Sequence, residues 1–322
     1  MAQAKGSLSQ VVIQKETTFG VAPGTPAAQL LYYSTCSLAL NRSQEQDDTL
    51  RGNRNPTKAM RGKDEVSGDL AANMQAYNGL LLLGLLGEVT TSGASAPYTH
   101  LFTVGDTLPS FLIEKGFINI GQYFRYLGCK IGSMKVSFSP FGAQQMTFSI
   151  QGAEEVTASE AFDSSPTDLT YAPFDGFSIG TIEEGGSTIA NVTSVDLEIS
   201  NDLDGDQYLL GGGGVRADIP EGTVSVTGTL HARFTDLTLY NKAINDTESS
   251  LKLIFALGTG AGTAGNESLE FYIPELTFTP KAPPISGPKG IVVELPFVGY
   301  YGNDAGASAL QITLKSPTAA IE

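Results

Sequence analysis

Cysteine and histidine are both scarce in this chain of 322 residues, which contains Cys36, Cys129, His100 and His231. Two thiols do not make a disulfide framework, so we expect two buried or half-buried thiols in a reducing compartment, with a single bridge as the alternative. The four residues lack the short spacings of a zinc site. Two histidines also provide few candidates for the base of a catalytic nucleophile–base pair. The sequence therefore predicts no catalytic residue, no metal and no cofactor.

Basic residues are few as well. Lys and Arg number 19 against 34 Asp and Glu, which gives a formal net charge of −15. So much negative charge repels phosphates and excludes a protein that wraps nucleic acid, although not one that lies close to DNA without binding it. Among 34 acids a pair suited to carbohydrate hydrolysis could always be found, so their abundance does not indicate an enzyme.

The chain also lacks an apolar run long enough to cross a membrane as a helix. Its most apolar segment, NGLLLLGLLGEV at 78–89, is shorter than the roughly 20 residues that a span requires. Because this segment is apolar on all sides, it predicts a short helix buried in a core. The opening residues MAQAKGSLSQVV show no secretory signal. We therefore expect no membrane partner.

Two short motifs match known sites only in part. The sequence GAGTAG at 260–265 fits G-x-G-x-x-G, but a strand pattern follows it where dinucleotide binding requires a helix, so it predicts a hairpin connection. The sequence DLDGD at 202–206 spaces Asp202, Asp204 and Asp206 as in a calcium loop. A glycine, however, stands at the twelfth position, where an EF-hand needs a glutamate. We interpret this motif as an acidic loop tip.

Strand patterns dominate the rest of the chain. Only two helices are predicted, at 75–87 and 236–245. Alternating or β-rich composition predicts strands at 36–41, 64–74, 110–117, 132–139, 145–152, 193–200, 223–234, 250–257, 268–278, 290–297 and 309–316.

The sequence also contains an internal repeat. The stretch VSGDLAANM at 66–74 matches VTGTLHARF at 226–234 with an offset of 160 residues, and the same offset aligns FLI at 111–113 with FYI at 271–273. Each copy of the first stretch follows a strand and a long loop and precedes a predicted helix. This order favours duplication over a chance resemblance between two alternating strands.

The repeat predicts two tandem domains. A segment rich in Ser, Thr, Asp and Pro at 156–176 is typical of a linker. We therefore expect one domain at 1–155 and a second at 156–322. Each should be a mainly antiparallel β-sandwich or barrel with one flanking α-helix.

Four segments in this order resemble the tail tube (major tail) proteins of long-tailed bacteriophages. They are YFRYLGCKIGSMKVSFSPFGAQQMTFSIQGAEE (123–155), TSVDLEISNDLDGDQYLLG (193–211), EGTVSVTGTLHARFTDLTLYNKAIN (221–245) and LEFYIPELTF (269–278). The resemblance implies a structural protein of the virion tail, assembled in the host cytoplasm and without catalysis. It further implies rings stacked into a tube that conducts the genome during ejection.

The same resemblance implies the partners. Single-domain members of this family form hexameric rings, so a chain with two fused domains would form a trimeric, pseudo-hexameric ring, with a hexamer as the alternative. Other tail proteins would bind at the ends of the tube. DNA would pass through the lumen without specific binding, and the acidic composition predicts a channel wall of net negative charge.

The resemblance also implies a role for the loop at 43–63. The corresponding loop of the family reaches toward a neighbouring ring or subunit. Its charges form an acidic block followed by a basic block, and a basic arm docking on an acidic neighbour would set the stacking orientation. The alternative is a solvated loop whose charges do little. The residues expected at inter-ring or inter-subunit contacts are Arg51, Arg54, Lys58, Arg61, Lys63, Glu45, Asp47, Asp48, Asp202, Asp204 and Asp206.

Two other classes of protein remain open at this stage. One is a different virion component built from β-sandwiches, such as a capsid decoration protein, a tail terminator or an adhesin. The other is an enzyme on a β-scaffold. The helix that follows the V-S/T-G strand in both halves favours the tail tube fold.

Overall fold

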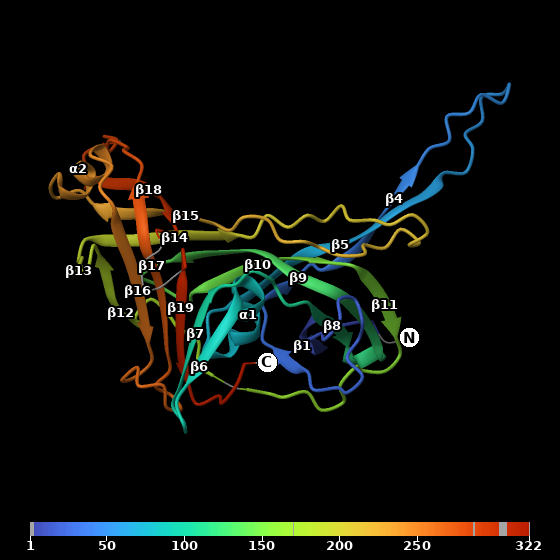
Figure 1. Cartoon of the computed structure of the whole chain (residues 1–322), viewed down its shortest axis with the longest axis horizontal. Helices are drawn as coiled ribbons and strands as arrows, with labels where there is room; N and C mark the ends of the chain where they lie inside the picture. The colour runs from blue at the N-terminus through green and yellow to red at the C-terminus, as the bar shows by residue number, and fades with distance from the viewer. Residues whose placement is uncertain (1–2, 170, 286, 303–307, 322) are drawn as a thin grey trace.

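The computed structural model of the chain describes residues 3–169, 171–285, 287–302 and 308–321. Its strands and α-helices are joined mainly by tight turns and a few long loops (Figure 1). The elements are β1 (Ser9–Lys15), β2 (Gln29–Leu31), β3 (Thr35–Cys36), β4 (Ala39–Glu45), β5 (Met60–Asn73), α1 (Gly79–Leu86), β6 (Gly87–Ser92), β7 (Tyr98–Val104), β8 (Phe111–Phe117), β9 (Gln122–Phe138), β10 (Gln145–Gly152), β11 (Glu154–Ala158), β12 (Ile179–Glu184), β13 (Ser187–Thr188), β14 (Val192–Ser200), β15 (Ser225–Arg233), α2 (Thr238–Ile244), β16 (Ser249–Ala256), β17 (Ser268–Phe278), β18 (Val292–Tyr300) and β19 (Gln311–Ser316).

The fold is mainly β, and the named strands that pair do so antiparallel in one large sheet. The predicted strands and both predicted helices are confirmed, most with boundaries shifted by a few residues, but β9 begins ten residues before its predicted start at 132, and the strand predicted at 36–41 is divided between β3 and β4. Strands β1, β2, β6, β7, β12 and β13 were not predicted, and neither was β11, which begins where the first predicted domain ends.

Strand pairing follows the same pattern in the two halves of the chain. In the first half β5 pairs with β4 and β10, β9 pairs with β10, β8 and β11, and β1 pairs with β8 and β2. In the second half β15 pairs with β14 and β18, β17 pairs with β18, β16 and β19, and β12 pairs with β16 and β13. Each strand of one list has a counterpart in the other.

The registers repeat too, and they correct one of the sequence matches. A register shift between Phe111 and Ile113 of β8 has its counterpart between Ser249 and Leu251 of β16. Phe111 therefore corresponds to Ser249, and its match with Phe271 at the offset of 160 is wrong. The reason is the hairpin β6–β7, which follows α1 and has no counterpart among the described residues of the second half, so the offset changes beyond the helix.

The earlier part of the sequence match agrees with the registers. Val66 of β5 pairs with Leu40 and Gly152, while Val226 of β15 pairs with Ile199 and Gly299. Because the neighbours on both sides correspond as well, β4 corresponds to β14 and β10 to β18.

The sheet runs across the expected boundary between the halves. Strand β9 pairs with β14, and β7 pairs with β19. The segment at 156–176, expected as a linker, begins inside β11, and its residue 170 lies outside the described residues, as do the ends of the predicted domains at 1 and 322. Phe174 donates a backbone hydrogen bond to Met74 (2.8 Å), so this segment also packs against the first half.

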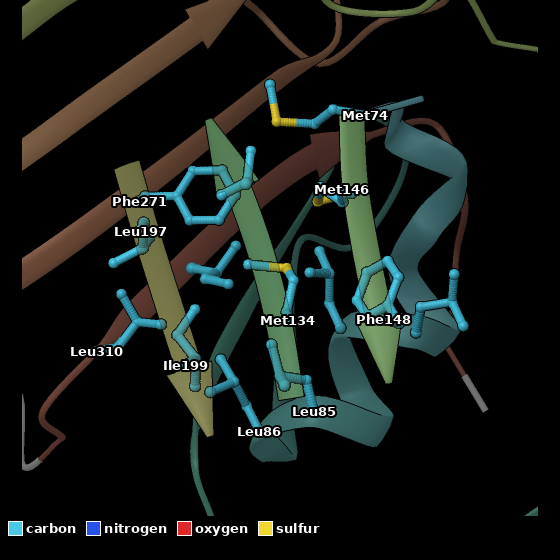
Figure 2. Packing of buried hydrophobic residues seen from close by; sticks show 14 of the residues in the cluster. Met74, Leu85, Leu86, Met134, Met146, Phe148, Leu197, Ile199, Phe271 and Leu310 are labelled. Carbon is cyan, nitrogen blue, oxygen red and sulfur yellow. The ribbon is translucent and has the colours of Figure 1, made fainter. Parts of the chain in front are cut away.

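The two helices differ in burial. All eight residues of α1, GLLLLGLL, are buried, as its uniformly apolar sequence requires, and the helix ends at Gly87 with a positive φ of 91°. Figure 2 shows Leu85 and Leu86 of α1 beside Met134 of β9 and Ile199 of β14. Helix α1 therefore covers the junction at which the two halves join. In α2 only Ala243 is buried.

Candidate functional site

The most prominent surface feature is a projecting arm formed by β4, β5 and the loop 46–59 between them (Figure 1). The irregular part is shorter than the predicted loop of 43–63, because β4 continues to Glu45 and β5 begins at Met60. Within the loop 46–59 Leu50 is 96% exposed. An apolar side chain this exposed is notable when it lies on a projecting segment.

The five basic residues of the arm fall into two groups. Arg61 and Lys63 lie on β5 and form ion pairs within the chain, Arg61 with Asp64 at 2.7 Å and Lys63 with Glu65 at 2.7 Å. Arg51 pairs with Asp47 inside the loop. Arg54 and Lys58 are exposed and form no ion pair with the described residues.

Two acidic residues of the arm, Asp47 and Asp64, accept hydrogen bonds from other residues of the arm. The pKa of Asp47 is lowered, first by hydrogen bonds from the side chain and backbone of Thr49 and then by Arg51. Glu45 is exposed at the end of β4, and Asp48 is exposed in the loop. At the base of the arm Asp64 is buried, and its pKa is lowered by hydrogen bonds first from Arg42 and then from Arg61.

A second long loop, residues 201–224 between β14 and β15, belongs to the second half but lies on the first half (Figure 1). Its anchor is Arg216, which is 8% exposed. One guanidinium nitrogen of Arg216 donates to the carbonyls of Val66 (3.0 Å) and Gly152 (2.9 Å). The side chain of Asn201 donates to the carbonyls of Leu85 and Ile131 at 2.9 Å each. The loop is thus fixed across β5, β10 and the end of α1.

Ion pairs strengthen this docking, with acids on the loop and bases on the first half. Asp206 accepts from Lys63 at 2.8 Å, and Glu221 accepts from Lys130 at 2.8 Å. Burial raises the pKa of Glu221, but hydrogen bonds from Lys130 and from the backbone of Leu108 outweigh burial and bring it below the ordinary value. Asp206, predicted as a contact residue, therefore contacts another half of the same chain.

The other two predicted acids of this loop lie at its surface. Asp204 accepts a hydrogen bond from the backbone of Asp206 (3.0 Å), and this bond, together with one from Gln207, lowers its pKa. Asp202 is exposed and has a positive φ of 45°. In the part of the chain that the structure describes, no group of three or more Asp, Glu, His or Cys could hold a metal ion.

One face of the sheet forms a shallow hollow of about 810 Å³ that spans the two halves. Burial alternates along its strands, so that β10, β9, β14, β15 and β18 turn apolar residues to the core and polar residues to this face. The polar lining residues include Lys135, Gln145, Thr147, Asp196, Glu198, Thr227 and Thr229. We call this surface the polar face.

Carboxylates outnumber cations on the polar face. Asp69, Asp196, Glu198 and Glu294 share its strand alternation, against Lys135, Arg233 and Lys281, which forms an ion pair with Glu294 at 2.5 Å. An ion pair joins Lys135 and Glu198 of neighbouring strands at 3.0 Å, and a hydrogen bond joins His231 and Asp196 at 3.0 Å. The contribution of β15 to this face includes His231, which agrees with its interpretation as a side chain on a strand face.

The other candidate site residues, which are His100, the two cysteines and the glycine motif at 260–265, have structural roles. His100 is buried and hydrogen-bonds to Thr91 (2.8 Å) and to the carbonyl of Thr318 (3.0 Å); burial lowers its pKa. Cys36 is half-buried and Cys129 is buried, and both are free thiols, as predicted. Burial raises the pKa of both thiols. The glycine motif at 260–265 connects the antiparallel strands β16 and β17, which confirms the predicted hairpin.

Sequence reasoning found the arm but missed the docking of the loop 201–224. The ligands of Arg216 are backbone carbonyls, which leave no trace in residue type. No helix among the described residues is long and apolar enough to span a membrane.

Comparison with known proteins gives one family match. The family described as phage tail tube protein matches residues 6–299, which is most of the chain. No curated protein matches it.

Proposed function

The chain belongs to the phage tail tube protein family, and on this premise we propose that three copies close into a ring and that such rings stack into the tube. The protein is a structural component of the virion tail rather than an enzyme, and its family implies self-assembly into a tube. The number of chains in a ring, the division into domains and the surfaces used are our proposals.

The repeated pairing pattern is the observation that supports a trimer. We propose that residues 1–155 and 156–322 are two copies of one domain, each with the same strand neighbours and one helix after β5 or β15. A ring of three such chains holds as many domains as a hexamer of single-domain subunits. The pairing of β9 with β14 supports this ring, because it shows how adjacent domains can share one sheet.

We assign the polar face to the wall of the channel. It crosses the junction between the halves, so repeating the junction around a ring would produce a continuous wall. Its excess of carboxylates would repel DNA phosphates at short range, where screening by physiological salt is incomplete. Stacking repeats the wall many times, and even a weak attraction in each ring would accumulate into a barrier to DNA passage.

We assign the arm to contacts between copies. Ordering a projecting segment costs conformational freedom, which contacts with another molecule would offset. Leu50 is exposed in the loop of the arm, and Arg54 and Lys58 have no ion pair with the described residues of their own chain. A basic tip and an acidic neighbour would attract each other and fix the orientation of stacking.

Negative-stain electron microscopy of the purified full-length protein tests the assembly. We expect rings or tubes with a central channel. A sample that stays monomeric at high protein concentration and over a range of salt concentrations would contradict the proposal. Native mass spectrometry of the rings then decides between three and six chains.

A further inference from the structure

The arm and the loop 201–224 occupy the same place in the repeated strand order. The loop 201–224 joins β14 to β15, and the loop 46–59 of the arm joins β4 to β5. The registers match β4 with β14 and β5 with β15. The two segments are therefore counterparts, although the arm projects while the loop 201–224 is docked (Figure 1). The docked loop shows which kind of surface the arm can use.

The loop between β14 and β15 covers two neighbouring strands and the end of a helix. Arg216 donates to the carbonyls of Val66 on β5 and Gly152 on β10. Asn201 donates to a carbonyl near the end of α1. The last residue of that helix, Leu86, is 1% exposed. In the first half, this surface is therefore closed by a segment of the other half.

The second half contains the same surface. Val66 of β5 pairs with Gly152 of β10, and Val226 of β15 pairs with Gly299 of β18, so Val226 and Gly299 are the counterparts of the residues that bind Arg216. The corresponding helix is α2, whose last residue, Ile244, is 56% exposed. Within the described chain, the end of α2 thus lacks the cover that the end of α1 has. We call Val226, Gly299 and the end of α2 the receiving surface.

Carboxylates adjoin the receiving surface. The hydroxyl of Tyr300, the residue after Gly299, donates to Glu248 at 2.7 Å. This bond first, then burial and the charges of nearby carboxylates, raise the pKa of Tyr300 to about 12. The carboxylates are those of Glu248, Glu275 and Asp246. Glu248 and Asp246 are exposed, and none of the three forms an ion pair with a base in the part of the chain that the structure describes.

The arm carries complementary features. Arg54 and Lys58 are exposed in its loop without an ion pair to the described residues, and Leu50 is 96% exposed. Opposite charges attract and fix orientation, while contact between Leu50 and Ile244 would remove apolar surface from water. The arm and α2 lie at opposite ends of the molecule (Figure 1). They can therefore meet only between copies.

We propose that the arm of one copy lies on the receiving surface of the next copy in the ring, as the loop 201–224 lies on the first half of its own chain. Leu50 then covers Ile244, and Arg54 and Lys58 face the three carboxylates. The contact rests on the proposed assembly into rings and names the surface that receives the arm. Its two sides are different parts of the molecule, so it is head-to-tail and closes when the rotation per copy is a simple fraction of a turn. Because rings must close before they stack, this contact also affects the length of the tube.

Cysteine cross-linking tests the position of the arm. The variant Leu50→Cys with Ile244→Cys, made in a Cys36→Ser background, should form disulfides between chains under mild oxidation of assembled rings. Non-reducing gels should show dimers and trimers of the chain. The matched control combines Leu50→Cys with Phe177→Cys, since Phe177 is 83% exposed and lies outside the receiving surface. Rings of the first variant that yield only single chains on the gel would overturn the proposal.

An exchange of charge tests the pairing itself. Arg54→Glu with Lys58→Glu should weaken ring formation about tenfold or more, because it brings like charges together across the contact. Glu248→Lys with Glu275→Lys should weaken it by a similar factor. The variant that carries all four substitutions should recover most of the loss, since the charges are again opposite. Sedimentation velocity over a range of protein concentrations measures ring formation, and circular dichroism of the monomer should not change.

The matched control for this exchange combines Arg54→Glu and Lys58→Glu with Glu88→Lys and Asp106→Lys. Glu88 and Asp106 are exposed in the first half, away from the receiving surface, so the net charge is the same but ring formation should stay weak. If the parent forms no rings, the proposed function fails. If the parent forms rings but the fourfold exchange recovers no more than the control, only this contact fails.

Discussion

The ring of Phe138 lies 5.0 Å from the ring of Phe255, although the two residues belong to different halves of the chain. Hydrophobic residues of both halves form one buried cluster, and Figure 2 shows Leu197 and Ile199 of the second half beside residues of the first. The halves therefore repeat a pairing pattern without being separate in the core. A shared core of this kind favours joint unfolding.

Replacing the anchor at this junction should destabilise the whole chain. We expect Phe138→Ala to lower the free energy of unfolding by about 3–5 kcal/mol, because it removes a buried ring and leaves a cavity. Phe141→Ala is the matched control, since Phe141 is 75% exposed three residues away. Urea denaturation followed by circular dichroism measures both. Equal midpoints for the two variants would show that Phe138 does not anchor the junction.

The docking of the loop 201–224 should depend on Arg216. We expect Arg216→Ala to leave the buried carbonyls of Val66 and Gly152 unpaired, at a cost of about 1–3 kcal/mol. Amide hydrogen exchange should rise throughout the loop and at the base of the arm. Arg233→Ala, at an exposed position on β15, is the control. Unchanged exchange in the loop of Arg216→Ala would mean that other contacts hold it in place.

The exposed bases of the arm should act between molecules rather than within one. We expect the replacement of Arg51, Arg54 and Lys58 by serine to leave the melting temperature nearly unchanged and to shorten the tubes seen in electron micrographs. Raised salt should have a smaller effect of the same sign, since exposed charges are screened over about 8–10 Å. Arg51 pairs only with Asp47 inside the loop, whereas Arg61 and Lys63 are left in place because they pair with Asp64 and Asp206 outside it. Tubes of normal length in the variant would indicate a solvated arm.

Acid should weaken the base of the arm through Asp64. Hydrogen bonds from Arg42 and then Arg61 lower the pKa of Asp64 from its ordinary value of 3.8. A lowered pKa means that its contribution to stability is fully present above pH 3.8 and is lost as the pH falls through the folded-state value. Asp64→Asn should therefore be less stable than the parent at pH 7, and the difference should shrink below pH 3.8. Urea midpoints at several pH values measure this difference, and a constant gap would contradict the assignment.

Reversing charge on the polar face should create affinity for DNA. We expect assembled Asp196→Lys and Glu294→Lys double variants to bind duplex DNA at low salt, whereas the parent should not bind it. The control carries Glu88→Lys and Asp106→Lys, which make the same change of net charge away from this face. Fluorescence anisotropy with a labelled duplex measures binding. Equal binding by both double variants would mean that net charge alone matters, not its position.

The sequence was most informative where side chains alternate over a long stretch. The strands at 145–152 and 268–278 were predicted within a residue because each alternates between a buried and a solvated side. Strands β6 and β7 were missed because they follow the buried helix directly and are joined by a short turn rich in Gly, Ser and Pro. Their presence also explains why the constant offset of 160 fails beyond the helix.

The contacts between the halves could not be predicted in the same way. The alternation of β14 indicates which side chains it buries, but not that its partner is β9 of the other half. The docking of Arg216 depends on two carbonyls that become neighbours only when β5 and β10 pair. For the arm, residue type predicted its charge and the family resemblance implied its projection, whereas the pairing of Arg61 with Asp64 depends on where β5 begins.

Cryo-electron microscopy of assembled rings tests the central claim most directly, because one map shows both the number of chains and the face that lines the channel. We predict three chains per ring, each contributing two similar domains, with Asp196 and Glu294 facing the lumen. Rings of six chains, or rings with the polar face on the outside, would contradict the account.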